Sequence, residues 1–243
     1  MDGSMATVTD SVEVVLFDVF GTVVDWRTSL QKWFQRFGRE QNLEADWVEL
    51  VDDWRAAYQP SLARVRDGAR PYVTLDVLHR ESLDVLLPRY GLSGLPENDR
   101  QRLTRAWRWL DPWLDVVAGL TRLKRKYVIG TLSNGGLGLL TDLAKFAGMP
   151  WDVVLSADLF QHYKPDAAVY LGAAELLGRP TSALMLVAAH NYDLGAARSH
   201  GYRTSFVARP TEYGPRKQAD SAVEGQWDYV VTSLEELAEK IGA

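Results

Sequence analysis

The sequence predicts an α/β fold in which a Rossmann-like parallel sheet core carries an inserted all-helical cap domain. An apolar run at about residues 12–18 has no polar alternation, which is typical of a central strand buried on both faces of a parallel sheet. From about residue 113 onward helical and strand patterns alternate, and this rhythm places helices on both faces of such a sheet. Residues 26–112 instead show helical periodicity with many aromatic residues and almost no β-branched run. The helical segment is therefore expected to interrupt the core after its first strand.

The cap is expected to contain four helices, and the core resumes after it with alternating elements. The cap helices are expected at about 27–40, 45–58, 73–88 and 98–109, with Pro and Gly breakers between them. The later core elements are expected as helix 115–125, strand 127–132, helix 137–147, strand 152–156, helix 166–177, strand 183–188, helix 192–200, strand 203–207, strand 228–231 and helix 233–241. The core domain thus comprises 1–25 and 113–243, and the cap domain 26–112. Ligands of open α/β sheets lie beyond the carboxyl ends of the strands, so the cap would cover that edge as a lid.

The composition excludes several classes of function. Lys and Arg total 27 against 32 Asp and Glu, giving a formal net charge of -5, and no basic stripe with aromatic residues appears, so nucleic acid is not expected as a partner. The chain has no cysteine, which excludes disulfides, thiolate nucleophiles and Cys-ligated metals. The four histidines lack metal-ligand spacing, and neither a metal nor another cofactor is expected. Residues 1–10 have no secretion-signal profile and no apolar run is long enough to span a membrane, so we expect a cytoplasmic protein with no membrane partner.

The first strand ends in Asp18, which makes this residue a candidate nucleophile. Gly21 breaks the strand, so Asp18 is expected to leave the core and face the crevice at the sheet edge, with Thr22 close behind it. A carboxylate at such a place can also cap the next turn, and this strand end alone does not decide between the two.

Two further strand ends carry polar groups at spacings that one site would need. After the second strand, Ser133 and Asn134 enter a Gly-rich turn that leads into a helix, where backbone donors can bind an anion. Such a turn is also ordinary helix-start chemistry. In the stretch 163–166, Pro165 is expected at the first helical position, which places Lys164 at the mouth of the sheet. A surface lysine is the alternative.

The fourth strand end completes a recognisable set. An apolar strand runs into His190 and Asp193, although a loop histidine and a helix-capping aspartate would look the same. Together, the four strand ends resemble the four motifs of the haloacid dehalogenase superfamily in their order, their spacing and the point of the helical insertion. The resemblance spans most of the chain.

Two positions separate the reactions that this resemblance implies. Most members of the superfamily are magnesium-dependent phosphatases with a second Asp two residues after the nucleophile, which protonates the leaving alkoxide; this chain has Phe20 there. They also hold their metal with a carboxylate four residues before the final Asp, where this chain has Ala189. A halide leaves without a proton and with little charge to neutralise. The pattern Phe-Asp-x-Phe-Gly-Thr around Asp18 resembles the branch that includes the L-2-haloacid dehalogenases.

The resemblance implies hydrolysis of a short 2-haloalkanoic acid, the expected small-molecule partner, through an ester on Asp18. Asp18 would attack the α-carbon while Lys164 keeps it ionised. Asp193 would orient or deprotonate the water that attacks the ester.

Arg55 is similar to the cap arginine that meets the departing halide in the family; a surface arginine on an amphipathic helix is the alternative. Ser133 and the turn behind it would bind the substrate carboxylate, and Asn134 would face the halide. The residues expected to contact substrate are Thr22, Ser133, Asn134, Tyr170, Tyr192, Phe20 and Tyr72.

The fourth strand end departs from the family pattern. Ala188 removes a hydroxyl, and His190 replaces an amide and could share the activation of water with Asp193. Tyr192 stands where the family commonly has Trp. If these bulky polar rings shrink the halide pocket or add donors to it, a small, strongly hydrogen-bonding halide such as fluoride would be favoured.

Two other functions stay open at this point. One is a magnesium-dependent phosphatase with an atypical site, and the other is a dehalogenase-like scaffold that binds a ligand without catalysis. A homodimer is common in the family, although no sequence feature here demonstrates one.

Overall fold

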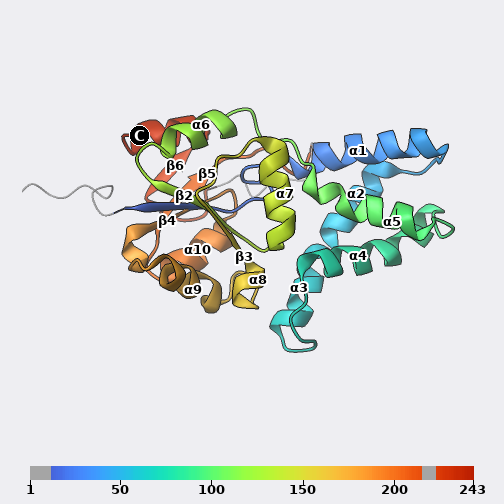
Figure 1. Cartoon of the computed structure of the whole chain (residues 1–243), viewed down its shortest axis with the longest axis horizontal. Coiled ribbons are helices and arrows are strands. Elements are labelled where there is room, and N and C mark those ends of the chain that lie inside the picture. The colour runs from blue at the N-terminus through green and yellow to red at the C-terminus, as the bar shows by residue number, and fades with distance from the viewer. Residues whose placement is uncertain (1–11, 215–222) are drawn as a thin grey trace, which may run out of the picture.

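The sheet has six parallel strands in the order β3-β2-β1-β4-β5-β6, with the first strand of the chain near its centre (Figure 1). The computed structural model describes residues 12–214 and 223–243; the segment 1–10, which we expected to lack a secretion signal, lies outside this range. The strands are β1 (Val14–Phe17), β2 (Val128–Ser133), β3 (Val153–Ser156), β4 (Leu184–Ala188), β5 (Arg203–Val207) and β6 (Tyr229–Val231). The predicted α/β class with a parallel sheet is confirmed.

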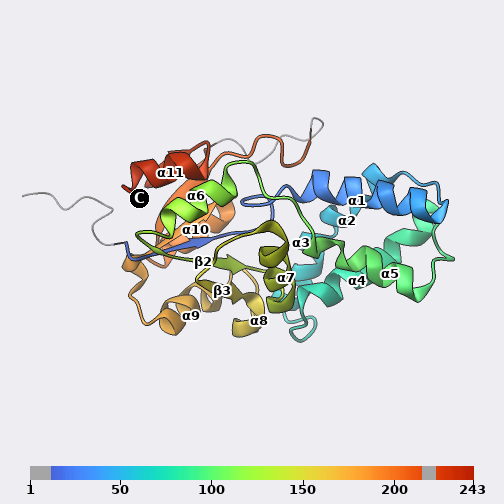
Figure 2. The same ribbon diagram turned by 45° about the horizontal axis from the view of Figure 1, so that its top comes forward.

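Both faces of the sheet are apolar, which explains the absence of polar alternation in β1. Val15 and Phe17 belong to one buried cluster and Val14 and Leu16 to another, because successive side chains of a strand point to opposite faces. The first cluster includes side chains of α6 (Val116–Leu123), α7 (Leu137–Ala147) and α11 (Leu234–Lys240). The second includes side chains of α9 (Ala167–Leu177) and α10 (Asn191–Ser199). Figure 2 shows α11 and α6 on one side of the sheet and α9 on the other.

The segment between β1 and α6 is helical throughout its regular elements and lies to one side of the sheet (Figure 1). Its elements are α1 (Trp26–Gln41), α2 (Trp47–Ala56), α3 (Tyr58–Arg66), α4 (Leu75–Leu86), η2 (Leu87–Tyr90), α5 (Glu97–Thr104) and η3 (Arg105–Arg108). Two short elements of the core, α8 (Ala157–Phe160) and η4 (Thr181–Ala183), complete the described structure. No helix in the described ranges is both long and apolar enough to cross a bilayer.

The expected helix 45–58 is wrong at its C-terminal end. It stops at Ala56, and a separate helix, α3, follows from Tyr58, which the sequence reading missed. Pro60 explains the break, because it has no backbone N–H to donate to the carbonyl of Ala56 and so cannot continue the α2 ladder. The new helix buries Tyr58 and Leu62.

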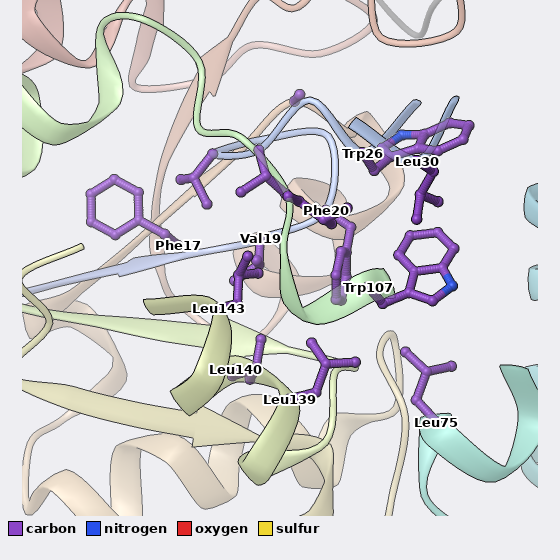
Figure 3. Close-up of a cluster of buried hydrophobic side chains, with 14 of the residues drawn as sticks. Phe17, Val19, Phe20, Trp26, Leu30, Leu75, Trp107, Leu139, Leu140 and Leu143 are labelled. Carbon is purple, nitrogen blue, oxygen red and sulfur yellow. The ribbon is translucent and has the colours of Figure 1, made fainter. Parts of the chain in front are cut away.

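An apolar seam joins the helical segment to the carboxyl end of β1 (Figure 3). The ring of Trp107 lies 5.5 Å from that of Phe20 in an edge-on arrangement and stacks on Trp26 at 6.2 Å. Trp107 and Trp26 come from the helical segment, whereas Phe20 follows β1. Aromatic pairs of this kind stabilise by about 0.5–1.5 kcal/mol beyond their buried area. The seam therefore holds the helices next to the edge of the sheet where the polar strand ends emerge.

Candidate active site

Five adjacent strand ends supply the polar side chains of the site. Asp18, Asn134 and His190 follow β1, β2 and β4, which are neighbours in the sheet. Lys164 lies between α8 and α9 in the connection that leaves β3, and Glu212 lies in the loop after β5. Parallel strands end at the same edge, so the connections carry side chains distant in sequence to one place.

Lys164 joins the two aspartates of the site. Its ammonium donates to Oδ1 of Asp18 at 2.9 Å and also to Oδ2 of Asp193. The second oxygen of Asp193 accepts a hydrogen bond from the hydroxyl of Tyr170 at 2.7 Å. The side chains of Lys164 and Asp193 are 1% and 0% exposed, so this ion pair is removed from solvent. Charged side chains are tolerated in a protein interior when they are ion-paired and hydrogen-bonded, as these are.

Thr22 ties the nucleophile candidate to the neighbouring strand. Its hydroxyl donates to Oδ2 of Asp18 at 2.8 Å and accepts from the backbone N–H of Ala189 at 3.0 Å. The donor and acceptor capacity of the hydroxyl is thus used on both sides. This arrangement holds the carboxylate of Asp18 in one orientation.

His190 bridges Asp18 and Glu212. Its Nδ1 lies 3.2 Å from Oδ2 of Asp18, and its Nε2 lies 3.1 Å from both carboxylate oxygens of Glu212. Ionised carboxylates only accept hydrogen bonds, so both ring nitrogens donate and the ring is an imidazolium. Glu212 also accepts from Nε1 of Trp26 at 3.1 Å.

These contacts set the charges of the site. Burial by itself would raise the pKa of Asp18, but the Lys164 ammonium and His190 outweigh it and hold that pKa well below its usual range. Burial would lower the pKa of Lys164, yet the carboxylates of Asp18 and Asp193 raise it above its ordinary value. Burial, aided by the charge of Asp18, raises the pKa of Asp193 despite Lys164. At neutral pH Asp18 is therefore an ionised carboxylate at a buried position.

The charge of His190 gives a stability prediction. Burial would lower its pKa, but Glu212 and Asp18 raise it to about 10. A raised pKa contributes stability that is complete below the unfolded-state value of about 6.5 and is lost as pH rises through the folded-state value. We expect the wild-type free energy of unfolding to fall between pH 7 and 9.5 by on the order of 3 kcal/mol more than that of His190→Gln. Urea unfolding of both proteins at the two pH values measures the difference, and parallel pH profiles would contradict the charge assignment.

A cavity of about 200 Å³ opens beside His190. Its lining residues are Trp26, Asp52, Arg55, Ala56, Tyr58, Gln59, His190, Tyr192 and Tyr213. The guanidinium of Arg55 lies 4.4 Å from the ring centre of Tyr58 and 5.2 Å from that of Trp26. Two aromatic faces orient this cation by cation–π attraction, and it makes no salt bridge within the described residues. The cavity thus contains a cation whose hydrogen-bond donors suit an anion.

Asn134 connects the two parts of the molecule. Its amide donates to the hydroxyl of Tyr58 at 3.0 Å, and its carbonyl oxygen accepts from the backbone N–H of Lys164 at 2.7 Å. Ser133 is buried beside it, and its hydroxyl accepts from the N–H of Gly135 at 3.2 Å. The turn after β2 therefore holds the backbone of Lys164 and also contacts the helical segment through Tyr58.

Of three other residues expected to contact substrate, one lines the cavity and two do not. Tyr192 lines the cavity, and its ring centre is 5.8 Å from that of His190. Phe20 packs into the apolar seam rather than lining the cavity. Tyr72 is not brought to the cluster: its hydroxyl donates to Asp158 at 2.7 Å, and its ring packs on Tyr163.

The expectation that Pro165 occupies the first helical position is wrong. Helix α9 begins at Ala167, with Asp166 as its N-cap residue. The carboxylate of Asp166 caps nothing, because it accepts from Arg66 at 3.0 Å and contacts His162 at 3.2 Å. This ion pair with α3 replaces the expected helix-start interaction, and Lys164 still reaches the site.

Sequence reasoning missed Glu212, Tyr58 and Trp26. The signal that points to Glu212 is its place in the loop after β5, at the same edge of the sheet as the other four strand ends. Tyr58 and Trp26 resembled ordinary buried aromatic residues of amphipathic helices. Within the described parts of the chain, no group of three or more His, Asp or Glu side chains has an arrangement that could hold a metal ion.

Known proteins resemble this chain over nearly its whole length. Residues 12–201 match the family model of the haloacid dehalogenase-like hydrolases. The chain is 27% identical over 237 residues to (S)-2-haloacid dehalogenase 4A of Burkholderia cepacia, which covers 94% of this chain and 99% of that protein. A solved L-2-haloacid dehalogenase structure is 50% identical with a TM-score of 0.91, covering 95% of this chain and 99% of the other. A solved defluorinating L-2-haloacid dehalogenase is 46% identical with a TM-score of 0.93, covering 96% of both chains.

Proposed function

The chain belongs to the haloacid dehalogenase-like hydrolases, and we propose that it hydrolyses short 2-haloacids to 2-hydroxy acids. The observation that carries this proposal is the state of Asp18: an ionised carboxylate, held by Lys164 and Thr22, next to a cavity that contains the Arg55 cation. A carboxylate nucleophile and a site for the departing anion are the two parts that halide displacement needs.

In the first step Asp18 attacks the halogen-bearing carbon and forms an ester. The carbon–halogen bond breaks, and its electron pair leaves with the halide. Phe20 stands two residues after the nucleophile and cannot donate a proton, which suits a leaving group that departs as a stable anion. Lys164 keeps Asp18 ionised, while Thr22 fixes its orientation.

Arg55 receives the halide in this proposal. Its donors act where negative charge develops, in a cavity partly walled by aromatic side chains. Ser133 and the turn behind it bind the substrate carboxylate. The helical segment 26–112 forms the cap domain, which closes the site from the side opposite the sheet.

In the second step water attacks the carboxyl carbon of the ester and releases the hydroxy acid. The oxygen that leaves with the product is the one that Asp18 contributed, and water restores the carboxylate. His190, whose Nδ1 lies 3.2 Å from Asp18, and Asp193, which shares the Lys164 ammonium with Asp18, are the two candidate bases for that water.

The cavity also bears on the choice of halide. At about 200 Å³, with His190 and Tyr192 in its wall, it is small and rich in donors. Fluoride is the smallest halide and accepts the strongest hydrogen bonds, so we include fluoroacetate among the proposed substrates. The similar structure described as defluorinating supports this choice.

Halide release in the presence of a chelator tests the function. We expect chloride from 2-chloropropionate and fluoride from fluoroacetate, each with one equivalent of hydroxy acid, and no loss of rate when EDTA is added. Magnesium-dependent hydrolysis of a generic phosphate ester, with haloacids left unchanged, would replace this proposal by the phosphatase alternative. Chloride release without detectable fluoride would remove only the proposed fluoride preference.

A further inference from the structure

We propose that Glu212 is a positioning residue that holds His190 as the base for hydrolysis of the Asp18 ester. This inference rests on the proposed function, because it concerns the second step of the same reaction. It assigns the activation of water to a His–Glu pair, in preference to Asp193.

Geometry is the first argument. His190 lies between Asp18 and Glu212, with each ring nitrogen facing one carboxylate at 3.1–3.2 Å. A nucleophile, a base within reach of it, and a third group that orients the base are the recurring parts of covalent hydrolysis. His190 also lines the cavity, so water there has access to it.

The position of Glu212 is built by three other contacts. Gly21 has a φ of 89°, and a Cβ atom at that position would overlap the carboxylate of Glu212. Trp26 donates to the same carboxylate. Arg209, three residues earlier in the loop, donates to the backbone oxygen of Thr22 at 2.9 Å and binds both oxygens of Asp115 at 2.8 and 2.9 Å. These contacts hold the loop in place, so the Glu212 carboxylate faces Nε2 of His190 and favours the neutral tautomer that carries its proton there.

Asp193 is less suited to be the base. One of its oxygens accepts from Lys164 and the other from Tyr170, and its side chain is 0% exposed. Both donors stabilise the ionised form, and Asp193 is not among the residues that line the cavity beside His190. We therefore assign Asp193 to the positioning of Lys164.

Ester formation converts His190 from a donor into a base. In the resting site two carboxylates hold its proton, and alkylation of Asp18 removes the charge of one of them. The proton on Nδ1 then passes to solvent, while Glu212 keeps the proton on Nε2. The free Nδ1 accepts a proton from water as the water oxygen bonds to the ester carbon.

The proton balance closes within the cycle. When the ester bond breaks, the proton on Nδ1 goes to the departing alkoxide and forms the hydroxy acid. The second proton of the water stays on the Asp18 carboxyl and returns to His190, which restores the resting ion pairs. Each turnover thus releases one halide and one proton.

Several groups act on the charge of His190 during this change. Those that face its ring or line the same cavity are Asp18, Glu212, Tyr192, Arg55, Tyr58, Tyr213 and Asp52, the last of which is paired with Arg27. Once Asp18 is esterified, the Arg55 cation favours the neutral ring, and Glu212 is the ionised carboxylate that still contacts it. The pH at which the ester decays should therefore report the His190–Glu212 pair.

Glu212→Gln tests the assignment. The introduced amide carries no charge to hold a proton on Nε2, and its NH2 can donate to Nε2 while its oxygen accepts from Trp26. The neutral ring then favours the tautomer with its proton on Nδ1, which weakens the base. We expect steady-state turnover of 2-chloropropionate to fall by about 10²-fold, in the range of a lost general base, while one equivalent of chloride is still released rapidly per site. Intact-mass measurement during turnover should show the alkylated enzyme. Glu239→Gln removes an exposed carboxylate on α11 and should retain wild-type rates.

The outcomes separate this inference from the function itself. Failure of the wild-type enzyme to release halide would end the proposed function. Wild-type turnover combined with equal loss of the rapid phase and the steady state in Glu212→Gln would overturn the inference alone. A second measurement needs no variant: in rapid-quench single turnovers the wild-type ester should decay faster as pH rises through one ionisation and more slowly in D₂O. Decay that is independent of both would equally overturn it.

Discussion

Replacing Asp18 with Asn is expected to abolish halide release, with a fall in kcat/KM of at least about 10⁴-fold for every haloacid that the wild-type enzyme accepts. The amide is a poor nucleophile, and no neighbouring carboxylate can take its place: Asp193 is held by Lys164 and Tyr170, and Glu212 lies beyond the ring of His190. The loss should appear in the first turnover, because the variant cannot form the ester. Ion chromatography of released halide measures it directly.

A labelling experiment distinguishes the nucleophile from a merely structural carboxylate. In a single wild-type turnover in oxygen-18 water, the label should enter Asp18 and not the hydroxy acid, which peptide mass spectrometry resolves. Asp142→Asn, which removes a surface carboxylate on α7, serves as the matched control and should keep full activity. Label found first in the product would show that water attacks the substrate directly, and would refute covalent catalysis by Asp18.

The residues at the strand ends could be predicted from the sequence because each follows a segment with a recognisable strand pattern. Asp18 directly follows an apolar strand and Asn134 directly follows the end of β2, and parallel strands deliver such residues to one edge whatever the loops between them do. Lys164 reaches the same place although its helix begins later than expected, because Asn134 accepts the hydrogen bond of its backbone N–H. That contact joins residues thirty positions apart and leaves no trace in local periodicity.

The parts that sequence reasoning missed depend on tertiary contacts. Glu212 belongs to a loop with no regular pattern, and only the folded chain shows that Gly21 leaves room for its carboxylate. The boundary between α2 and α3 had a local cause in Pro60, but the aromatic periodicity of the region concealed it. Tyr72 is expected to contact substrate, whereas its hydroxyl donates to Asp158 instead, a tertiary contact with no local sequence signal.

Replacing Lys164 with Met should damage both stability and catalysis. The side chain is 1% exposed and stands between Asp18 and Asp193, so its loss leaves two buried carboxylates without their shared cation. Removal of one partner from a buried ion pair costs about 3–5 kcal/mol, and we expect a fall of that size in the free energy of unfolding at pH 7. Chemical denaturation measures it. Lys124→Met, which breaks an ion pair with Asp152 at the surface, should cost less than about 1 kcal/mol.

The catalytic effect of Lys164→Met has its own signature. Without the ammonium, burial and the charge of Asp193 raise the pKa of Asp18, and a protonated carboxyl cannot attack carbon. Halide release at neutral pH should therefore fall by about 10²–10³-fold, as when one preorganised charge is removed from an active site. The acid limb of its pH profile should also move to higher pH than in the wild-type enzyme. A variant that is destabilised but keeps the wild-type acid limb would show that His190 and Thr22 alone keep Asp18 ionised, and that Lys164 serves the fold and not the nucleophile.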